Sequence, residues 1–353
     1  MRSTIRLAFA GLSLLNLIGC KKDEPGEKLV GYTTVSTLAG NGTYGLTNST
    51  GTAAQFCFPE GAAVDSQGNL YVADAGNACI RKVTPAGVVT NFTGAGLGFV
   101  NGPLATAKFS TIEDVAFDNQ GNLYVADAGN NCIRKITTAG MVSTLAGSGT
   151  AGFADGPGAT AQFDSPNSIA IDAQGLIYVS DHDNARIRKI APNGIVSTLA
   201  GTGQLGFVDG AGNVAQFIRP TGLAVTAQGL VYVADFAGHR IRAITSAGVV
   251  STLAGDGVRG SSDGTGASAR FSAPYDVTID SQGDIYVADM FNHCIRKVTA
   301  GGTVTTLAGT KVKGVVNGPV GTAQFDLPAG IVAGANGTLY VMEDADVRKI
   351  TAQ

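Results

Sequence analysis

A five-residue motif that recurs six times constrains the fold of this chain more than any other feature. The motif Leu-Tyr-Val-Ala-Asp at Leu70–Asp74 returns, with small changes, at Leu123–Asp127, Ile177–Asp181, Val231–Asp235, Ile285–Asp289 and Leu339–Glu343. The acidic residue that ends each copy follows the previous one after 53 residues and then four times after 54. Such self-similarity is typical of repeat architectures, in which each unit buries its apolar face against its neighbours.

Each unit predicts four short β-strands. In the first unit, alternating apolar residues and turn signals place strands at 62–65, 70–74, 80–83 and 88–92. The chain is rich in turn residues, with 50 glycines among 353 residues. Four antiparallel strands per unit form the blade of a propeller, so we predict an all-β, six-bladed β-propeller.

The two ends of the repeat array predict a closed ring. The sixth unit stops after its third strand, at 347–350, whereas residues 34–40 ahead of the first unit closely resemble the fourth-strand sequence at 196–201. We therefore expect the N-terminal strand to complete the last blade, which removes an exposed sheet edge. The predicted propeller spans residues 33–353.

The first residues have the pattern of a secretory leader. Arg2 and Arg6 precede an apolar stretch at 7–18 that is too short to span a bilayer and ends at Gly19-Cys20. This ending resembles the lipobox of bacterial lipoproteins, which implies a signal peptide at 1–19, cleavage before Cys20 and acylation of Cys20. A plain secretory signal with an incidental cysteine is the alternative.

A polar segment follows the cysteine. Residues 20–32 predict an acylated cysteine and a flexible tether. Its Lys22-Asp23-Glu24 run resembles the surface-export signal of some Gram-negative lipoproteins, with an ordinary solvated linker as the alternative. We expect a lipid-anchored protein of the outer membrane, and exposure at the cell surface stays open.

The repeat itself resembles a known family. The units share, with departures, the pattern Phe-x-x-Pro, inner strand, Gly, Tyr-Val-Ala-Asp and then Asn-x-x-Ile-Arg-Lys, and the copy at 289–297 contains Asn-His-Cys-Ile-Arg-Lys. This pattern resembles the NHL repeat. The resemblance implies a propeller fold, but propellers of this kind serve as binding modules, as lyases and as lactonases.

Residues that repeat in every blade favour a structural role. The acids that end the second strands are matched by arginines across the hairpin, and each acid is expected to accept hydrogen bonds from its own hairpin backbone. The positive charges are spread around the ring, and removal of Arg2 and Arg6 with the leader takes the formal net charge from −3 to −5. We therefore expect no nucleic-acid partner.

Residues that differ between blades mark the candidate site. The inner strands begin at one mouth of the central channel, and the residues predicted there are Glu60, Glu113, Asp114, Asn167, Thr221, Tyr275 and Asp276. We expect Glu60, Glu113 and Asp114 in one sector, with Tyr275 and Asp276 opposite. Such carboxylates are candidate ligands for Ca²⁺ or a candidate general base. The alternative is a hydrated acidic mouth with no specific ligand.

The histidines and cysteines give weaker signals. The peptide-amidating lyase of the same fold carries zinc-binding histidines beside the inner-strand prolines, whereas His182, His239 and His293 lie in hairpins, so we expect no catalytic zinc. The cysteines after the tether are Cys57, Cys79, Cys132 and Cys294. Only Cys57 and Cys79 lie in loops that can meet, and we expect mostly unpaired, partly buried thiols.

Aromatic residues in the loops between blades have two interpretations. Phe99, Phe153 and Phe207 each precede an Asn-Gly or Asp-Gly turn. They are either exposed anchors for a partner or residues that hold a long loop against the blade edge.

These features favour a non-enzymatic, monomeric binding scaffold of the cell envelope for a protein, peptide or glycan partner. The main alternative is a metal-dependent lyase or lactonase with its site at the channel mouth, using Glu60, Glu113 and Asp276. A structural role in envelope assembly is a third possibility.

Overall fold

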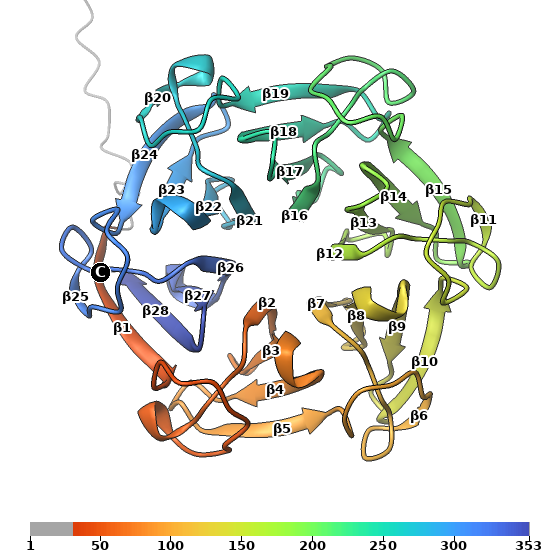
Figure 1. Ribbon diagram of the computed structural model, residues 1–353, viewed down its shortest axis with the longest axis horizontal. Coiled ribbons are helices and arrows are strands. Elements are labelled where there is room, and N and C mark those ends of the chain that lie inside the picture. Colours follow the sequence, from red (N-terminus) through yellow and green to blue (C-terminus); the bar gives the residue numbers. More distant parts are fainter. Residues whose placement is uncertain (1–30, 353) are drawn as a thin grey trace, which may run out of the picture. The chain divides into compact units, whose positions relative to one another are not determined.

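Six β-sheets stand around a central channel in the computed structural model, which describes residues 31–352 (Figure 1). The predicted six-bladed, all-β propeller is confirmed. The predicted signal peptide at 1–19, the candidate lipidation residue Cys20 and the Lys22-Asp23-Glu24 run lie outside the described residues. The first strand already begins at Tyr32, one residue inside the predicted tether.

In blades 1 to 5 the four long strands run outward from the channel in chain order. Blade 1 contains β2 (Pro59–Val64), β3 (Leu70–Asp74), β4 (Cys79–Val83) and β5 (Val89–Thr93). Blade 2 contains β7 (Ile112–Phe117), β8 (Leu123–Asp127), β9 (Cys132–Ile136) and β10 (Met141–Ala146). Blade 3 contains β12 (Pro166–Ile171), β13 (Ile177–Asp181), β14 (Arg186–Ile190) and β15 (Ile195–Ala200).

The second half of the ring repeats this order. Blade 4 contains β16 (Pro220–Val225), β17 (Val231–Asp235), β18 (Arg240–Ile244) and β19 (Val250–Ala254). Blade 5 contains β21 (Pro274–Ile279), β22 (Ile285–Asp289), β23 (Cys294–Val298) and β24 (Thr303–Ala308). Blade 6 contains β26 (Pro328–Ala333), β27 (Leu339–Glu343), β28 (Asp346–Ala352) and the N-terminal strand β1 (Tyr32–Gly40).

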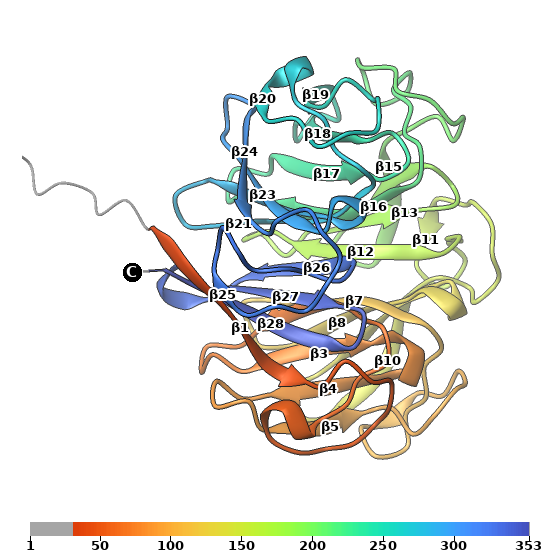
Figure 2. The same cartoon turned by 60° about the vertical axis from the view of Figure 1, so that its left-hand side comes forward.

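The N-terminal strand closes the ring as predicted. β1 pairs antiparallel with β28, from Tyr32 opposite Ala352 to Gly40 opposite Asp346. Figure 2 shows β1 alongside β28 at the outer edge of this blade. The first and last described segments thus share one sheet. Because β1 pairs with β28, the backbone edge of β28 is not exposed.

Four blades have a fifth strand that the sequence did not predict. The two-residue strands β6 (Gly102–Pro103), β11 (Gly156–Pro157), β20 (Gly264–Thr265) and β25 (Gly318–Pro319) pair with the outermost strand of their blade. The glycine that begins each has a φ between 127° and 150°, which favours glycine. This backbone turns the loop between blades back along the blade edge. Blades 1 and 4 keep four strands, as predicted for all six.

Short 3₁₀ turns complete the secondary structure. They are η1 (Gly51–Ala53), η2 (Ala75–Asn77), η3 (Ala128–Asn130), η4 (Gly266–Ser268), η5 (Met290–Asn292) and η6 (Ala335–Gly337). Of these, η2, η3 and η5 lie in the hairpins after the second strand of their blades. No helix among residues 31–352 is long and apolar enough to cross a membrane.

The hydrophobic core lies between neighbouring blades. The cluster between blades 1 and 2, for example, packs Tyr71 and Ala73 against Phe109, Ile112 and Val115. The phenylalanine that precedes each inner strand is fully buried in all six repeats, at Phe56, Phe109, Phe163, Phe217, Phe271 and Phe325. Each blade therefore depends on the next one to bury its apolar face.

Candidate functional site

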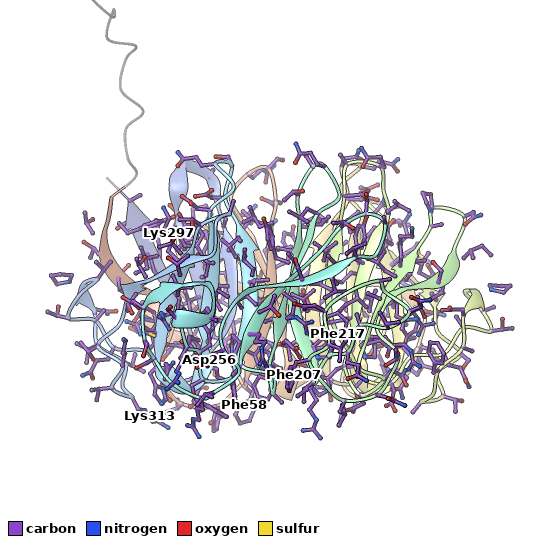
Figure 3. The ribbon with its side chains drawn as sticks, turned by 90° about the horizontal axis from the view of Figure 1, so that it is seen from above. Phe58, Phe207, Phe217, Asp256, Lys297 and Lys313 are labelled. Atoms are coloured by element: carbon purple, nitrogen blue, oxygen red, sulfur yellow. The ribbon has the colours of Figure 1, made fainter. Side chains whose placement is uncertain are left out.

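The propeller has two faces that differ in sequence. One carries the loops between blades and the hairpins after the second strands, and we call it the loop face. The other carries the tight turns within blades, and we call it the turn face. In Figure 3, Phe58 and Lys313 lie toward the loop face and Lys297 lies toward the opposite side. Because each inner strand begins beside the loop face, the candidate residues of the channel mouth lie there.

The repeated acids and arginines form a buried structural layer. Asp74 and Arg81 in blade 1 are both fully buried and lie 2.8 Å apart. The other blades repeat the pair as Asp127–Arg134, Asp181–Arg188, Asp235–Arg242, Asp289–Arg296 and Glu343–Arg348. Each arginine also donates to loop carbonyls, as Arg81 does to Gln55. The predicted structural role is confirmed.

The backbone partner of these acids differs from the prediction. Asp74 accepts a hydrogen bond of 2.7 Å from the backbone N–H of Cys57, 17 residues earlier, and the other five acids repeat this contact. The hairpin contributes a side chain instead, since Asn77 donates to Asp74. Each acid thus fastens the incoming loop to its blade.

At the mouth, side chains from opposite blades meet across the channel axis. The Tyr275 hydroxyl in blade 5 donates to Glu113 Oε2 in blade 2 at 3.2 Å. Asn167 Nδ2 in blade 3 donates to both Glu113 Oε2 and the Tyr275 hydroxyl oxygen, each at 3.2 Å. Tyr275 was expected opposite Glu113. The two residues do come from opposite blades, and the long tyrosine side chain spans the channel between them. The three residues close the channel, and we call them the plug.

Glu60 lies beside the plug without a hydrogen bond on one of its oxygens. Its Oε2 atom is buried and has no partner among the described residues. Burial raises the pKa of Glu60 well above its usual range, and the charges of Glu113 and Asp276 add to this shift. Burial also raises the pKa of Glu113. Both carboxyl groups therefore keep their protons to a higher pH than exposed glutamates do.

Asp114 and Asp276 bind the inner strands of the next blades rather than facing a ligand. Asp114 Oδ2 accepts from the backbone N–H of Ile169 at 3.0 Å and from the Ser168 hydroxyl at 2.7 Å. Asp276 Oδ2 accepts from the N–H of Ile331 at 2.8 Å. Burial raises the pKa of Asp114 to about 7 and that of Asp276 well above its usual range.

Each of these two aspartates faces a glycine in the preceding blade, and only a residue without a side chain leaves room for the carboxylate. A Cβ atom on Gly61 would lie 2.0 Å from Asp114 Oδ1, and one on Gly222 would lie 2.1 Å from Asp276 Oδ1. The glycine of one blade therefore makes room for the carboxylate of the next. Thr221, the remaining mouth residue, is buried and donates to the Ala234 carbonyl.

Of the proposed calcium ligands Glu60, Glu113 and Asp114, two are already held by hydrogen bonds within the protein. Asp114 is committed to backbone N–H groups, and Glu113 is held by the plug. Within residues 31–352, no group of three or more His, Cys, Asp or Glu side chains is arranged to hold a metal ion. The donor set therefore does not fit Ca²⁺, which prefers six to eight oxygen ligands.

Two of the three histidines connect blades. His239 Nδ1 accepts from the N–H of Ala273 at 3.0 Å, and His293 Nδ1 accepts from the N–H of Leu327 at 3.2 Å. Asn131 Oδ1 makes the same contact to Ser165 in an earlier blade. All three side chains act as acceptors, which requires Nδ1 of each imidazole to be unprotonated.

The cysteines after the tether are free thiols, as expected. Cys79, Cys132 and Cys294 are buried, and Cys57 is half-buried. Burial raises the pKa of Cys79 to about 12, which keeps this thiol protonated.

The loop phenylalanines stack on arginines. Phe153 lies 3.7 Å from the guanidinium carbon of Arg186, and Phe207 lies 4.3 Å from that of Arg240, measured to the ring centroids. Phe99 packs on Arg134 at 4.9 Å. These contacts hold the loops to the blades, although all three rings stay partly exposed.

The sequence interpretation missed a set of exposed apolar residues on the loop face. Tyr44, Leu97 and Leu205 occupy the same repeat position in blades 1, 2 and 4, and they are 53%, 74% and 64% exposed. The same position holds Ala151 in blade 3 and Arg259 and Lys313 in blades 5 and 6. An alignment of the six repeats at this loop position would have revealed the change from apolar to basic residues.

Comparison with known proteins supports the repeat assignment. Residues 56–83, 109–136, 163–190 and 217–244 match the NHL repeat. Protein SUPPRESSOR OF QUENCHING 1 from Arabidopsis thaliana is 30% identical over 308 residues, covering 81% of this chain and 29% of that protein. NHL repeat-containing protein 2 from Bos taurus is 30% identical, with 83% and 46% covered. The chain thus spans less than half the length of either relative.

Solved structures share the fold at low sequence identity. An auxiliary nutrient binding protein from Bacteroides thetaiotaomicron superposes with a TM-score of 0.69 at 17% identity, covering 91% of this chain and 76% of that one. A streptogramin B lyase superposes with a TM-score of 0.56 at 13% identity, covering 91% and 98%. The described chain is therefore a six-bladed β-propeller that carries NHL repeats in its first four blades.

Proposed function

We propose that this chain is a lipid-anchored protein of the cell envelope that binds a protein, peptide or glycan partner through its loop face. The observation that carries the proposal is that one repeat position holds a large, exposed apolar residue in three of the blades, as Tyr44, Leu97 and Leu205. Large exposed apolar side chains on a rigid surface favour association with a partner. Phe58, 46% exposed and 4.7 Å from the Tyr44 ring, extends this surface.

The charge of the loop face supports an asymmetric partner. Arg259 and Lys313 replace the apolar residues in blades 5 and 6. A partner with an apolar segment beside an acidic segment would match both parts of the ring. The fold similarity to an auxiliary nutrient binding protein agrees with a binding role.

The test is capture of a partner from cells that make loop-face variants. We expect Leu97→Asp with Leu205→Asp to abolish co-purification of the partner after reversible cross-linking, because two charges would enter the interface. The matched control is Met141→Asp with Ile195→Asp, which changes two exposed apolar residues that begin strands beside the turn face. Equal capture by both double variants would contradict the proposal.

The lipid anchor is tested at Cys20. Mass spectrometry of the envelope protein should show an acylated N-terminal Cys20 after removal of residues 1–19, and Cys20→Ala should release the chain from the outer membrane. Protease treatment of intact cells then distinguishes surface exposure from a periplasmic orientation.

The alternative, a metal-dependent lyase or lactonase, predicts a bound divalent ion that depends on the mouth acids. Elemental mass spectrometry of the purified chain should find no stoichiometric Ca²⁺ or Zn²⁺ if the scaffold proposal holds. An ion that is present in the wild type and lost in Glu60→Gln with Glu113→Gln would favour the enzyme instead.

A further inference from the structure

A polar hollow opens beside the plug on the loop face. It has a volume of about 300 Å³, and its lining includes Glu113, Asn167 and Tyr275 from the plug together with His182 and Asp183 from blade 3. At about 30 Å³ per water molecule, this space suits a ligand of roughly ten non-hydrogen atoms. Ala128 and Gly129 form part of its wall and keep it open, because they carry little or no side chain.

One oxygen of Glu113 is held in place and the other is free. Glu113 Oε2 accepts from Tyr275 and from Asn167. Glu113 Oε1 has no hydrogen-bond partner among residues 31–352. It is also absent from the fully buried, unpaired atoms of these residues, so a ligand can reach it. The plug thus fixes an acceptor at the floor of the hollow, and such preorganisation lowers the entropic cost of binding.

The opposite wall offers further acceptors. His182 Nδ1 lies 3.0 Å from Asp183 Oδ1. Because a carboxylate can only accept, Nδ1 carries the hydrogen and Nε2 of the neutral ring is left as an acceptor. Burial lowers the pKa of His182, which agrees with the neutral form. Asp183 is 43% exposed, so its carboxylate lies at the edge of the hollow.

Three carboxyl groups lie at or near this hollow. His182 feels the charges of Asp183 and Asp164 and that of the cation Arg219. Glu113 adds a third carboxyl group at the floor. The lining also contains the hydroxyl residues Thr111 and Ser165, which can donate or accept. The carboxyl and imidazole acceptors favour a ligand that donates several hydrogen bonds and carries positive charge.

We propose that the hollow binds a small molecule that carries a primary ammonium group, with the ammonium donating to Glu113 Oε1 and to the His182–Asp183 pair. This inference goes beyond the proposed docking of a partner on the loop face and does not depend on it. The Phe236 ring packs edge-to-face on Tyr275, with ring centroids 5.6 Å apart.

The test measures binding of ethanolamine and D-glucosamine to the purified mature chain by calorimetry. Ethylene glycol and D-glucose are the neutral counterparts. We expect each ammonium compound to bind at least about tenfold more tightly than its neutral counterpart. Glu113→Gln should weaken this binding about tenfold or more, because the amide replaces one of the two acceptor oxygens with an NH₂ donor.

Asp344→Asn is the control, because Asp344 lies in the hairpin of blade 6, on the far side of the ring from blade 3, and does not line the hollow. It should change the affinity by less than about twofold. If Glu113→Gln does not fold, Asp183→Asn replaces it and should weaken binding about threefold or more.

Three results would overturn the inference: no binding of either ammonium compound at about 10 mM, equal binding of the neutral counterparts, or unchanged binding by the Glu113 and Asp183 variants. Tighter binding of Nα-acetyl-lysine amide than of both small compounds would assign the ammonium group to a lysine of a protein partner. That result would likewise overturn the assignment to a small molecule. Loss of partner capture tests the loop-face proposal separately.

Discussion

The buried arginine of each blade has a second partner, and that partner differs between blades. Arg134 in blade 2 pairs with Asp127 at 2.6 Å and with the neutral Asn101 at 2.7 Å. Arg188 in blade 3 pairs with Asp181 at 2.6 Å and with a second acid, Asp155, also at 2.6 Å. The same change of the buried acid should therefore have unequal effects in the two blades.

Asp127→Asn leaves the Arg134 guanidinium fully buried with no carboxylate. Loss of one partner of a buried ion pair costs about 3–5 kcal/mol, because the remaining charge is uncompensated. Asp181→Asn leaves Arg188 with Asp155, whose side chain is 43% exposed. Solvent screens such a pair, so we expect it to reduce the loss by only about 1 kcal/mol.

The assay is urea unfolding of the two variants at neutral pH, followed by circular dichroism. The Asp127→Asn protein should be less stable than the Asp181→Asn protein, and Asn101→Asp should restore part of the loss in the blade 2 variant. Equal losses of unfolding free energy in both blades, or losses below about 1 kcal/mol in each, would refute the argument that each acid compensates the charge of a buried arginine.

Three further predictions concern the connections between blades. Burial lowers the pKa of His239 and His293 below the unfolded value of about 6.5. Their stabilising effect is therefore complete above that pH and is lost as the pH falls through the folded pKa. The double variant His239→Asn with His293→Asn should have a melting temperature that depends less on pH between about 5 and 7. Gly61→Ala should destabilise the chain by about 1–3 kcal/mol because the new Cβ would meet Asp114, whereas Gly321→Ala, with nothing within 4 Å, should have little effect in the same unfolding assay. Deletion of β1 should expose the β28 edge and cause self-association by light scattering, and a stable monomer would contradict ring closure by this strand.

The fold could be predicted from the sequence because every blade repeats the same information. The strand motif at 70–74, its period and the displaced fourth strand at 34–40 each agree with the others. The added strands such as β6 could not be predicted, because a Gly-Pro pair has no alternating pattern. Their formation depends on the path of the loop along a neighbouring edge.

The candidate site could be placed but not assembled from the sequence. Repeat alignment located Glu113 and Tyr275 at the channel mouth, in blades that face each other. It could not show that the tyrosine side chain crosses the axis to reach the glutamate, because the channel width is a tertiary property. Asp114 was likewise placed correctly, while its contact with Ile169 depends on how closely the next blade packs.

The most direct test of the loop-face proposal is site-specific photo-cross-linking in living cells. A photoreactive residue is placed in turn at Leu97 and Leu205 on the loop face, and at Met141 and Ile195 beside the turn face. All four positions are exposed, between 41% and 74%. The proposal predicts that Leu97 and Leu205 cross-link to the same partner and that Met141 and Ile195 do not. Cross-links to that partner from Met141 and Ile195, with none from Leu97 and Leu205, would contradict it.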